Sequence, residues 1–368
     1  MSASATRRRL RAIAARGLKS APVVVHPDEP VDGPALLAAV SKERLTGLAL
    51  DAVAGGALEL DPADADDLSV RHDDQLALDL RLERLLCTAA AELDAAGITY
   101  RALKGPLLAH TVYRDPALRS FGDIDILVRG ADFDAAVDAL RALEFHRRFV
   151  EPRPRFDARF SKGACLERAD GLEVDLHRTL APGPFGMLLG FTDLVGRAPQ
   201  TFVLGDATIT GLDRELAFVH ACFHSALGDY PPRLVPLRDI AELLAAGFDA
   251  RVVIDLVTDA QCEIVLQRAL DALTSVLGVP VDGEIADWAR TLEPSRFDRR
   301  ALRTYESSDR SYAKQAAVSL WAMPSLRHRL AYASALAIPS RNYVRARERG
   351  YARRLGHSLA LARGGRSR

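Results

Sequence analysis

The chain lacks an excess of charge of either sign, because 49 basic and 49 acidic residues give a formal net charge of zero. No global field therefore favours nucleic acid or a membrane as a partner. Only four cysteines are present, widely separated and without a CxxC pair, which predicts buried free thiols in a reducing compartment. The sequence has no apolar run of transmembrane length, and its basic N-terminus lacks an apolar signal segment. We therefore expect a cytoplasmic protein without a transmembrane segment.

Lysine is also scarce, since only five of the 49 basic residues are lysines. We attribute this arginine bias to overall composition, so arginine runs carry little functional weight and each lysine gains interest. The last stretch, from Arg341 to Arg368, holds nine arginines and one acidic residue, Glu348. We favour a solvated terminal helix with a disordered tail, and contact with phosphates or a membrane surface is the alternative.

The length of 368 residues predicts two domains, or one domain with an appendage. We divide the chain into an N-terminal helical segment (1–66), a core (67–212) and a helical C-terminal region with a basic tail (213–368). The acidic, proline-containing stretch 58–75 predicts a linker or turn. It leads into a long amphipathic helix expected over 68–97.

Strand-like and helix-like patterns alternate within the core. A short strand ends at Lys104-Gly105, a helix follows from Pro106, and "FGDIDILVR" is a second strand. After another helix, two strand-like runs flank Asp170-Gly171, a hairpin signal, and a second hairpin is expected at Gly205-Asp206. The order β-α-β-α-β-β over residues 98–178 predicts a small α/β or α+β unit, followed by helices after 212.

Carboxylates interrupt two of these apolar strands. Asp123 and Asp125 are two residues apart in "FGDIDILV", so in a strand they project from the same face. In "LEVDLHR", Glu173, Asp175 and His177 likewise share a face. If the two strands are neighbours, Asp175 converges on the Asp123/Asp125 pair. Clustered carboxylates raise one another's pKa, and Mg²⁺ ions relieve this repulsion by taking hard oxygen ligands.

The alternative is a buried ionic cluster in which these aspartates pair with Arg119, Arg129 or Arg178. The upstream Lys104-Gly105 turn favours the metal site instead. A glycine between strand and helix lets backbone N–H groups approach a phosphate, and a lysine beside it meets a triphosphate as a point charge. A solvated turn lysine is the competing interpretation of Lys104.

Five further residues are candidates for the same cleft. Arg119 and Ser120 precede the acidic strand and could reach phosphate oxygens, although a carboxylate partner and a plain turn role are their alternatives. His220 and His224 have the i, i+4 spacing of a zinc site, but no glutamate lies between them. We expect them to pack or to close over the cleft. Asp239 either orients a histidine or faces a helix dipole. The candidate cleft residues are therefore His177, His220, His224 and Asp239.

These motifs resemble a known family. "LKG", the Tyr and Arg ahead of "DIDILV", and then "VDLH" are similar to the uncharacterised nucleotidyltransferase family of the DNA polymerase β-like superfamily, over residues 96–180. The region "LAFVHACFHSALGDYPPRLVPLRDIAELL" resembles that family's histidine-bearing helix and the helix after it. The resemblance departs from the superfamily at the turn, where Lys-Gly replaces Gly-Gly or Gly-Ser.

The resemblance implies an α+β fold, in which a small polymerase β-like core with a mixed sheet stands between N-terminal helices and a helical C-terminal region. It implies that Asp123 and Asp125 hold two Mg²⁺ ions and that Asp175 holds the catalytic ion and helps deprotonate the nucleophile. It places Lys104 and Gly105 at the phosphate turn.

The expected activity is Mg²⁺-dependent transfer of NMP from an NTP, ATP among the candidates, to an unidentified small-molecule or protein acceptor, with release of pyrophosphate. An RNA-modifying transferase is one alternative, which the zero net charge disfavours. A catalytically inactive nucleotide-binding module is the other, which the presence of all three carboxylates disfavours.

Overall fold

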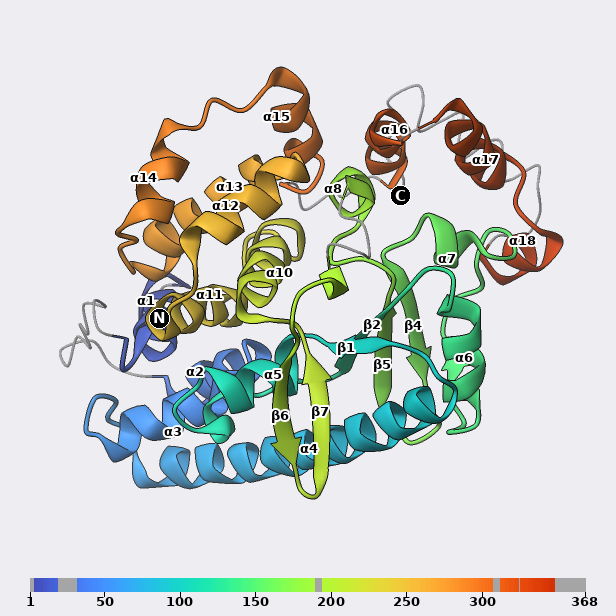
Figure 1. The fold of residues 1–368 in the computed structure, drawn as a ribbon. Helices are drawn as coiled ribbons and strands as arrows, with labels where there is room; N and C mark the ends of the chain where they lie inside the picture. Colours follow the sequence, from blue (N-terminus) through green and yellow to red (C-terminus); the bar gives the residue numbers. More distant parts are fainter. Residues whose placement is uncertain (1–2, 19–31, 189–193, 307–311, 324, 348–368) are drawn as a thin grey trace.

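The computed structural model describes residues 3–18, 32–188, 194–306, 312–323 and 325–347. Figure 1 shows a central sheet with the N-terminal helices below it and helices of the C-terminal region above it. Most of the basic tail expected after Arg341 lies outside the described residues.

One mixed sheet organises the molecule. Its strands follow the order β3-β4-β5-β2-β1-β7-β6, in which β2–β5 and β1–β7 are parallel pairs and the others are antiparallel. With helices around this sheet, the expected α+β class is confirmed. The strands are β1 (Tyr100–Ala102), β2 (Ile124–Val128), β3 (His146–Arg147), β4 (Gly163–Glu167), β5 (Glu173–His177), β6 (Gln200–Leu204) and β7 (Ala207–Gly211).

Helices make up most of the rest of the described chain, with a 3₁₀ turn at Pro116–Leu118 and a π-helical turn at Leu273–Leu277. The α-helices are α1 (Ala3–Ala15), α2 (Gly33–Lys42), α3 (Thr46–Ala54), α4 (Pro62–Ala95), α5 (Lys104–Thr111), α6 (Phe133–Arg141), α7 (Phe156–Arg159), α8 (Gly183–Leu188), α10 (Arg214–Leu227), α11 (Leu234–Ala246), α12 (Ala250–Asp259), α13 (Glu263–Ala272), α14 (Glu284–Thr291), α15 (Arg296–Arg303), α16 (Tyr312–Ala322), α17 (Leu326–Ala337) and α18 (Arg341–Arg347).

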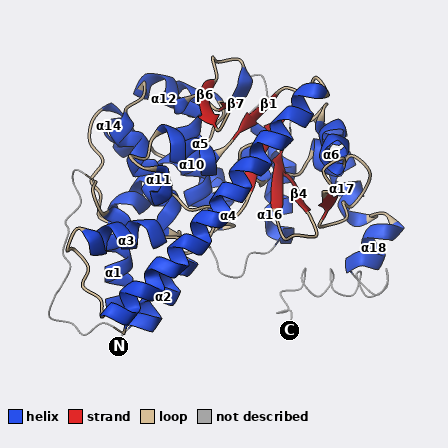
Figure 2. Cartoon of the chain, turned by 90° about the horizontal axis from the view of Figure 1, so that it is seen from below, coloured by secondary structure: helices blue, strands red, loops and turns tan. Residues whose placement is uncertain are grey.

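The long helix α4 begins earlier than expected. Its N-cap is Asp61 and Pro62 takes the first helical position, where the missing N–H costs nothing. Acidic residues such as Asp64 then lie near the positive end of the helix dipole. The linker expected over 58–75 is therefore wrong beyond Asp61. Figure 2 shows α4 crossing the molecule diagonally, and it contacts β2, β6 and β7. The division at 66/67 and 212/213 stays a proposal, with its first boundary inside α4.

Both expected hairpins are confirmed. β4 and β5 pair around a turn in which Gly171 has φ +83°, and β6 and β7 pair around Gly205 with φ +56°. Positive φ is costly for residues with a Cβ, so glycine suits these two turns. All four cysteines are free thiols, as expected, but only Cys222 and Cys262 are buried, whereas Cys87 and Cys165 are half-buried. No helix among the described residues is both long and apolar enough to cross a bilayer.

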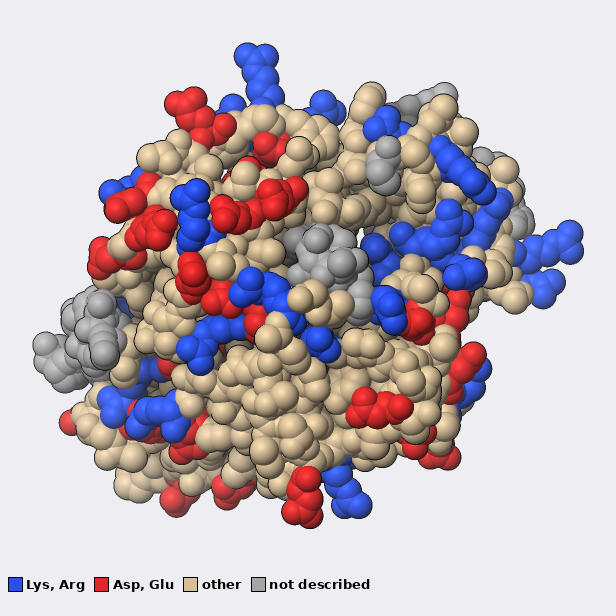
Figure 3. Space-filling model, viewed as in Figure 1, with Lys and Arg blue, Asp and Glu red and all other residues tan. Residues whose placement is uncertain are grey.

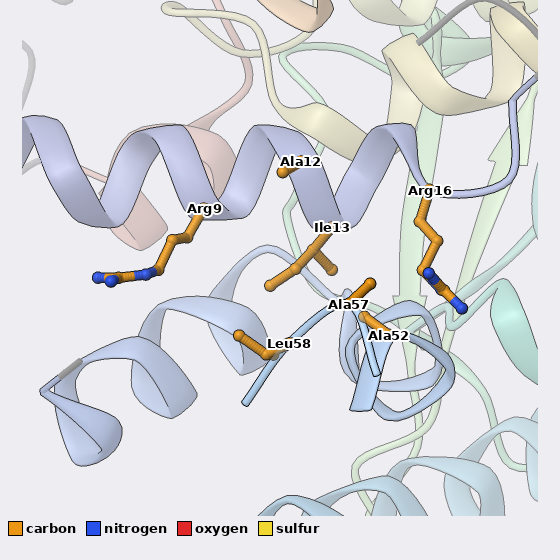
Figure 4. Close-up of a pocket in the computed structure, with 7 residues that line it drawn as sticks. All are labelled: Arg9, Ala12, Ile13, Arg16, Ala52, Ala57 and Leu58. Carbon is orange, nitrogen blue, oxygen red and sulfur yellow. The ribbon is translucent and has the colours of Figure 1, made fainter. Parts of the chain in front are cut away.

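Two hydrophobic cores hold the fold together. The larger one includes buried residues of the sheet, of α4 and of the helices from α10 to α15. The smaller one joins Phe156 and Phe160 of α7 to Met323, Tyr332 and Ala335 near the C-terminus. Figure 4 shows a small cavity between α1 and α3, about 10 Å³ in volume and lined mainly by apolar side chains. A space of this size holds one water at most, so it is a packing defect.

Candidate active site

The two acidic strands are neighbours, which the sequence patterns had left open. β2 and β5 run parallel, and Asp125 lies directly opposite Asp175 in the register. Ile124 and Ile126, which alternate with Asp125, are fully buried on the other face of the sheet. The sheet thus places two carboxylates side by side on one face.

The third carboxylate is in a different local structure from the one expected. Asp123 lies in a bend just before β2, which begins at Ile124. Its side chain is 30% exposed, whereas that of Asp125 is 1% exposed. The repulsion from Asp125, together with burial, raises the pKa of Asp123. The carboxylates therefore interact electrostatically, although only Asp125 and Asp175 are strand residues.

Two ammonium groups and one imidazole touch the strand carboxylates. Nζ of Lys104 lies 3.0 Å from Oδ1 of Asp125, and Nζ of Lys162 donates to Oδ2 of Asp175 at 2.6 Å. Nε2 of His177 lies 3.0 Å from both Asp125 Oδ1 and Asp175 Oδ2. Lys104 is therefore an ion-pair partner of a buried carboxylate rather than a solvated turn residue.

These contacts decide the charge state of the cluster. Burial alone would raise the pKa of Asp125, but Lys104 and His177 hold it well below its usual range. Burial is likewise overcome at Asp175, where His177 and Lys162 lower the pKa. Burial and Lys162 oppose protonation of His177, yet the two carboxylates raise its pKa. The cluster is thus a network in which Lys104, Lys162 and His177 keep two carboxylates ionised in a site of low exposure.

The Lys104-Gly105 turn has an unusual backbone. Lys104 has φ +20° and Gly105 has φ +34°, ψ −117°, at the start of α5. Such conformations cost about 1–3 kcal/mol for a residue with a Cβ. The ion pair with Asp125 fixes Lys104 in this geometry, and an added Cβ at Gly105 would be strained although it has room. The turn is therefore specialised at the residue that contacts the acidic strand.

Arg119 and Asp239 form a second buried pair beside the carboxylates. Nε of Arg119 donates to Oδ1 of Asp239 at 2.7 Å, and its second nitrogen donates to Oδ2 at 2.8 Å. The hydroxyl of Tyr113 donates to the same carboxylate at 2.8 Å. Asp239 thus binds Arg119 and Tyr113, and does not orient a histidine. Ser120 is buried, and its hydroxyl has no hydrogen-bond partner in the described chain.

The arginines proposed as alternative partners of the aspartates bind elsewhere. Arg119 pairs with Asp239, Nε of Arg129 donates to Asp132, and Nε of Arg178 donates to the carbonyl of Ser161. The ionic cluster of Asp125 and Asp175 is therefore built from lysines and a histidine.

The two histidines of α10 line the same region. The ring of buried His220 meets the His177 ring edge to face, with centroids 6.0 Å apart. His224 lies one turn later and lines the pocket described next. Burial, together with the nearby charge of Lys104, lowers the pKa of both His220 and His224 well below 6.5, so both rings are neutral. They pack beside the carboxylates, as expected, and neither joins the candidate metal-binding group found in the described residues.

A pocket of about 170 Å³ opens beside the acidic strand. Asp123 and Asp125 form its acidic side, and Lys104, Arg44 and Arg233 supply cations. Nη1 of Arg44 lies 4.0 Å from Asp123. The remaining lining residues are Gly105, Arg119, Phe121, His224, Val235 and Pro236. Cations beside carboxylates suit a ligand that carries both phosphate and a metal ion.

Three basic residues of this site were missed in the sequence. Lys162 stands immediately before β4. Lysine is rare in this chain, and that rarity was the one signal in the sequence that could have drawn attention to it. Arg44, which follows α2, and Arg233, the N-cap of α11, reach the pocket from distant parts of the chain. No spacing motif connects them to the acidic strand.

The residues present fit a divalent cation. Asp125, Asp175 and His177 each offer a ligand atom, and these atoms lie within 4.8 Å of one another. Carboxylate oxygens are the ligands that Mg²⁺ prefers. Lys104 and Lys162 contact the same oxygens, so a bound ion would compete with their ammonium groups.

A second hollow, about 180 Å³ in volume, adjoins β4. Cys165 of β4 lies opposite Asp175 in the register and lines this hollow with Phe149, Phe156 and Tyr343. Its polar lining includes the Ser161 hydroxyl, which donates to Asp157. The lining of this hollow is mixed, since Glu151 and Asp157 stand beside the apolar side chains, and the strand neighbour Cys165 is its link to Asp175.

Comparisons with known proteins point to one family. The family model described as "Uncharacterised nucleotidyltransferase" matches residues 29–278, about two thirds of the chain. A solved structure of an antigenic nucleotidyltransferase-like protein from Paracoccidioides brasiliensis is 14% identical, with a TM-score of 0.31. It covers 55% of this chain and 94% of its own. A TM-score this low does not establish a shared fold. The comparison with curated proteins found no match.

Proposed function

Because this chain belongs to the uncharacterised nucleotidyltransferase family, we propose that it transfers NMP from an NTP to an acceptor and releases pyrophosphate. The main observation in support of this proposal is that Asp125 and Asp175 lie side by side, next to a pocket lined by basic residues. The donor set supports Mg²⁺ as the metal, with Asp123, Asp125 and Asp175 as its carboxylate ligands and two ions as the proposed count.

In the proposed reaction an acceptor oxygen or nitrogen attacks the α-phosphorus, and the bond to the bridging oxygen of the β-phosphate breaks. Lys104, Arg44 and Arg233 line the pocket in which the triphosphate would lie, and Gly105 would let the backbone approach it. Bound Mg²⁺ would supply charge neutralisation and a lower pKa for the attacking group. Through its ion pair with Asp239, Arg119 would hold in place the segment that precedes Asp123. A phosphate contact by Arg119 or by Ser120 stays a prediction.

The acceptor would enter from the other side of Asp175. The hollow is lined by aromatic side chains such as Phe149 and Phe156 and by the carboxylates Glu151 and Asp157, which suits an acceptor with an apolar and a polar portion, whether a small molecule or a protein side chain. Lys162 and His177 keep Asp175 ionised through its Oδ2, so its carboxylate can accept a hydrogen bond from the attacking group. The free cysteines agree with a cytoplasmic location, where NTP and Mg²⁺ are available.

An inactive nucleotide-binding module is the second candidate, and one observation favours it. Lys104, Lys162 and His177 already neutralise Asp125 and Asp175 without any metal ion. A structural ion cluster of this kind would keep Asp125 and Asp175 paired without Mg²⁺, so a nucleotide bound in the neighbouring pocket would not be transferred. Transfer chemistry separates the two candidates.

The test follows radiolabel from an NTP into a fractionated extract that supplies acceptors. We expect label at the α-phosphate, but not at the γ-phosphate, to reach an acceptor in Mg²⁺ and not in EDTA. Asp125→Asn should abolish transfer, whereas Asp138→Asn, a 67% exposed carboxylate on α6, should retain it. Loss of the product to ribonuclease would identify an RNA acceptor. Transfer that persists in Asp125→Asn would refute the assignment.

A further inference from the structure

The end of the described chain exposes an unusual density of large apolar side chains. Trp321 is 70% exposed, Leu326 69%, Leu330 62% and Ile338 63%. These four fall within eighteen consecutive residues, at the end of α16 and along α17. Large apolar side chains that are exposed so close together in the sequence mark an interaction site more often than scattered exposure does.

The apolar residues of α17 form a stripe along one side of the helix. Leu326, Leu330, Ala333 and Ala337 follow the i, i+4, i+7, i+11 spacing of a single helix face. Arg327 follows Leu326 and Arg329 precedes Leu330. Each arginine is therefore about 100° around the helix axis from its neighbouring leucine, one on each side of the stripe. The guanidinium of Arg329 lies 6.0 Å from the Trp321 ring centroid, which keeps the tryptophan beside the stripe.

The opposite side of α17 already has a partner within the chain. Tyr332 and Ala335 are buried in the small core with Phe156 and Phe160 of α7. The Tyr332 ring lies 5.7 Å from that of Phe156 and 5.4 Å from that of Phe160. The helix is therefore anchored by its inner face, and the leucine stripe is directed away from the protein.

The charge around the stripe has one sign. From Tyr312 to Arg347 the sequence contains six Lys and Arg residues and no Asp or Glu. Arg327 of α17 and Arg341 and Arg345 of α18 are exposed. Figure 3 shows Lys and Arg side chains gathered over α7, α17 and α18, whereas Asp and Glu are prominent over α12 to α14. The zero net charge of the chain hides this separation.

We propose that α17, with Trp321 and the arginines of α18, docks this end of the protein on an anionic phospholipid membrane. Leucines with a tryptophan suit the boundary between head groups and acyl chains, and flanking arginines reach lipid phosphates. A second copy of the chain that used the same face would bring like charges together, and with three of the four exposed apolar side chains aliphatic the face offers nucleic acid little stacking surface. The inference does not depend on the transfer reaction.

Vesicle binding of the full chain tests this proposal. In a Trp288→Phe background, Trp321 is the sole tryptophan, so its emission reports transfer out of water. We expect a blue shift and co-flotation with phosphatidylglycerol-rich vesicles, little of either with phosphatidylcholine alone, and weaker binding at high salt. Leu326→Ser/Leu330→Ser should weaken binding by at least roughly tenfold. Val70→Ser/Leu80→Ser, at two exposed positions of α4, should not.

The leucine substitutions leave every arginine in place, so they separate this face from attraction by the arginine-rich tail alone. Vesicle binding that survives them would overturn the proposal, as would a protein that stays in solution at all lipid concentrations. If the substitutions instead abolish self-association or RNA retention and no vesicle binding is seen, the face serves another partner and the proposal fails.

Discussion

The ammonium group of Lys104 lies 3.0 Å from Oδ1 of Asp125, and both side chains are largely buried. Burial opposes the charge on each group, yet the carboxylates, Asp125 first, raise the pKa of Lys104. The pair therefore holds a strained turn against the acidic strand. A divalent ion at Asp125 would have to displace or share this ammonium group, which links metal binding to the position of Lys104.

Replacement of Lys104 by methionine tests that link. Breaking a buried ion pair leaves Asp125 under-neutralised, so Lys104→Met should lower the free energy of unfolding by about 3–5 kcal/mol in EDTA. Mg²⁺ should restore part of this loss, because a cation can take the vacated place. Urea unfolding with and without Mg²⁺ measures both effects, with the exposed Lys42→Met as a control. Equal loss in Mg²⁺ and EDTA would contradict a metal site at Asp125.

Asp79 gives the fold a specific pH dependence. Its Oδ1 accepts hydrogen bonds from Gln75 and from the backbone N–H of Phe121, near the acidic strand. Burial raises the pKa of Asp79 from 3.8 to about 6. The folded state therefore binds this proton more tightly than the unfolded state. Protonated Asp79 thus contributes to the free energy of unfolding at low pH. That contribution falls as pH rises from about 4 to about 6, and is constant above that range.

Asp79→Asn should remove this contribution and keep the Oδ1 acceptor. We expect the variant to be more stable than the wild type at pH 7 by about 1–3 kcal/mol, and similar to it at pH 4. Unfolding free energies of both proteins between pH 4 and pH 8 provide the measurement. Parallel profiles for the two proteins would show that Asp79 is ionised in the folded state throughout this range.

Arg119 and Asp239 should behave as a strongly coupled pair. Asp239→Asn or Arg119→Met alone leaves a buried partner without its counter-charge, so each should cost about 3–5 kcal/mol. The double variant Arg119→Met/Asp239→Asn removes both charges and should cost much less than the sum of the two single losses. A double-mutant cycle in urea measures the coupling, and additive losses would contradict it.

Much of the site could be predicted from local sequence pattern. Asp123 and Asp125 interrupt an apolar run, and strand alternation directs Asp125 and Asp175 away from their apolar neighbours. The hairpin at Asp170-Gly171 followed from turn chemistry. Their side-by-side position, however, depends on parallel pairing of β2 with β5, which no short-range signal specifies.

The basic residues could be predicted only in part. Lys104 stood out because it adjoins a glycine at a strand end, but its partner Asp125 was not foreseen. Lys162, Arg44 and Arg233 come from separate parts of the chain and meet the carboxylates through tertiary packing.

The start of α4 was missed because a proline followed by acidic residues suits both a linker and a helix N-terminus.

The central claim is that an NTP binds with a metal ion at the Asp125 strand. Its most direct test is thermal unfolding with each of the four NTPs, in Mg²⁺ and in EDTA, for the wild type, Asp125→Asn and the control Asp138→Asn. An NTP at a hundredfold its dissociation constant adds about 2.7 kcal/mol to stability. We predict a Mg²⁺-dependent rise in unfolding temperature for at least one NTP in the wild type and the control, and none in Asp125→Asn. A rise that persists in EDTA or in Asp125→Asn, or the absence of any rise, would contradict the account.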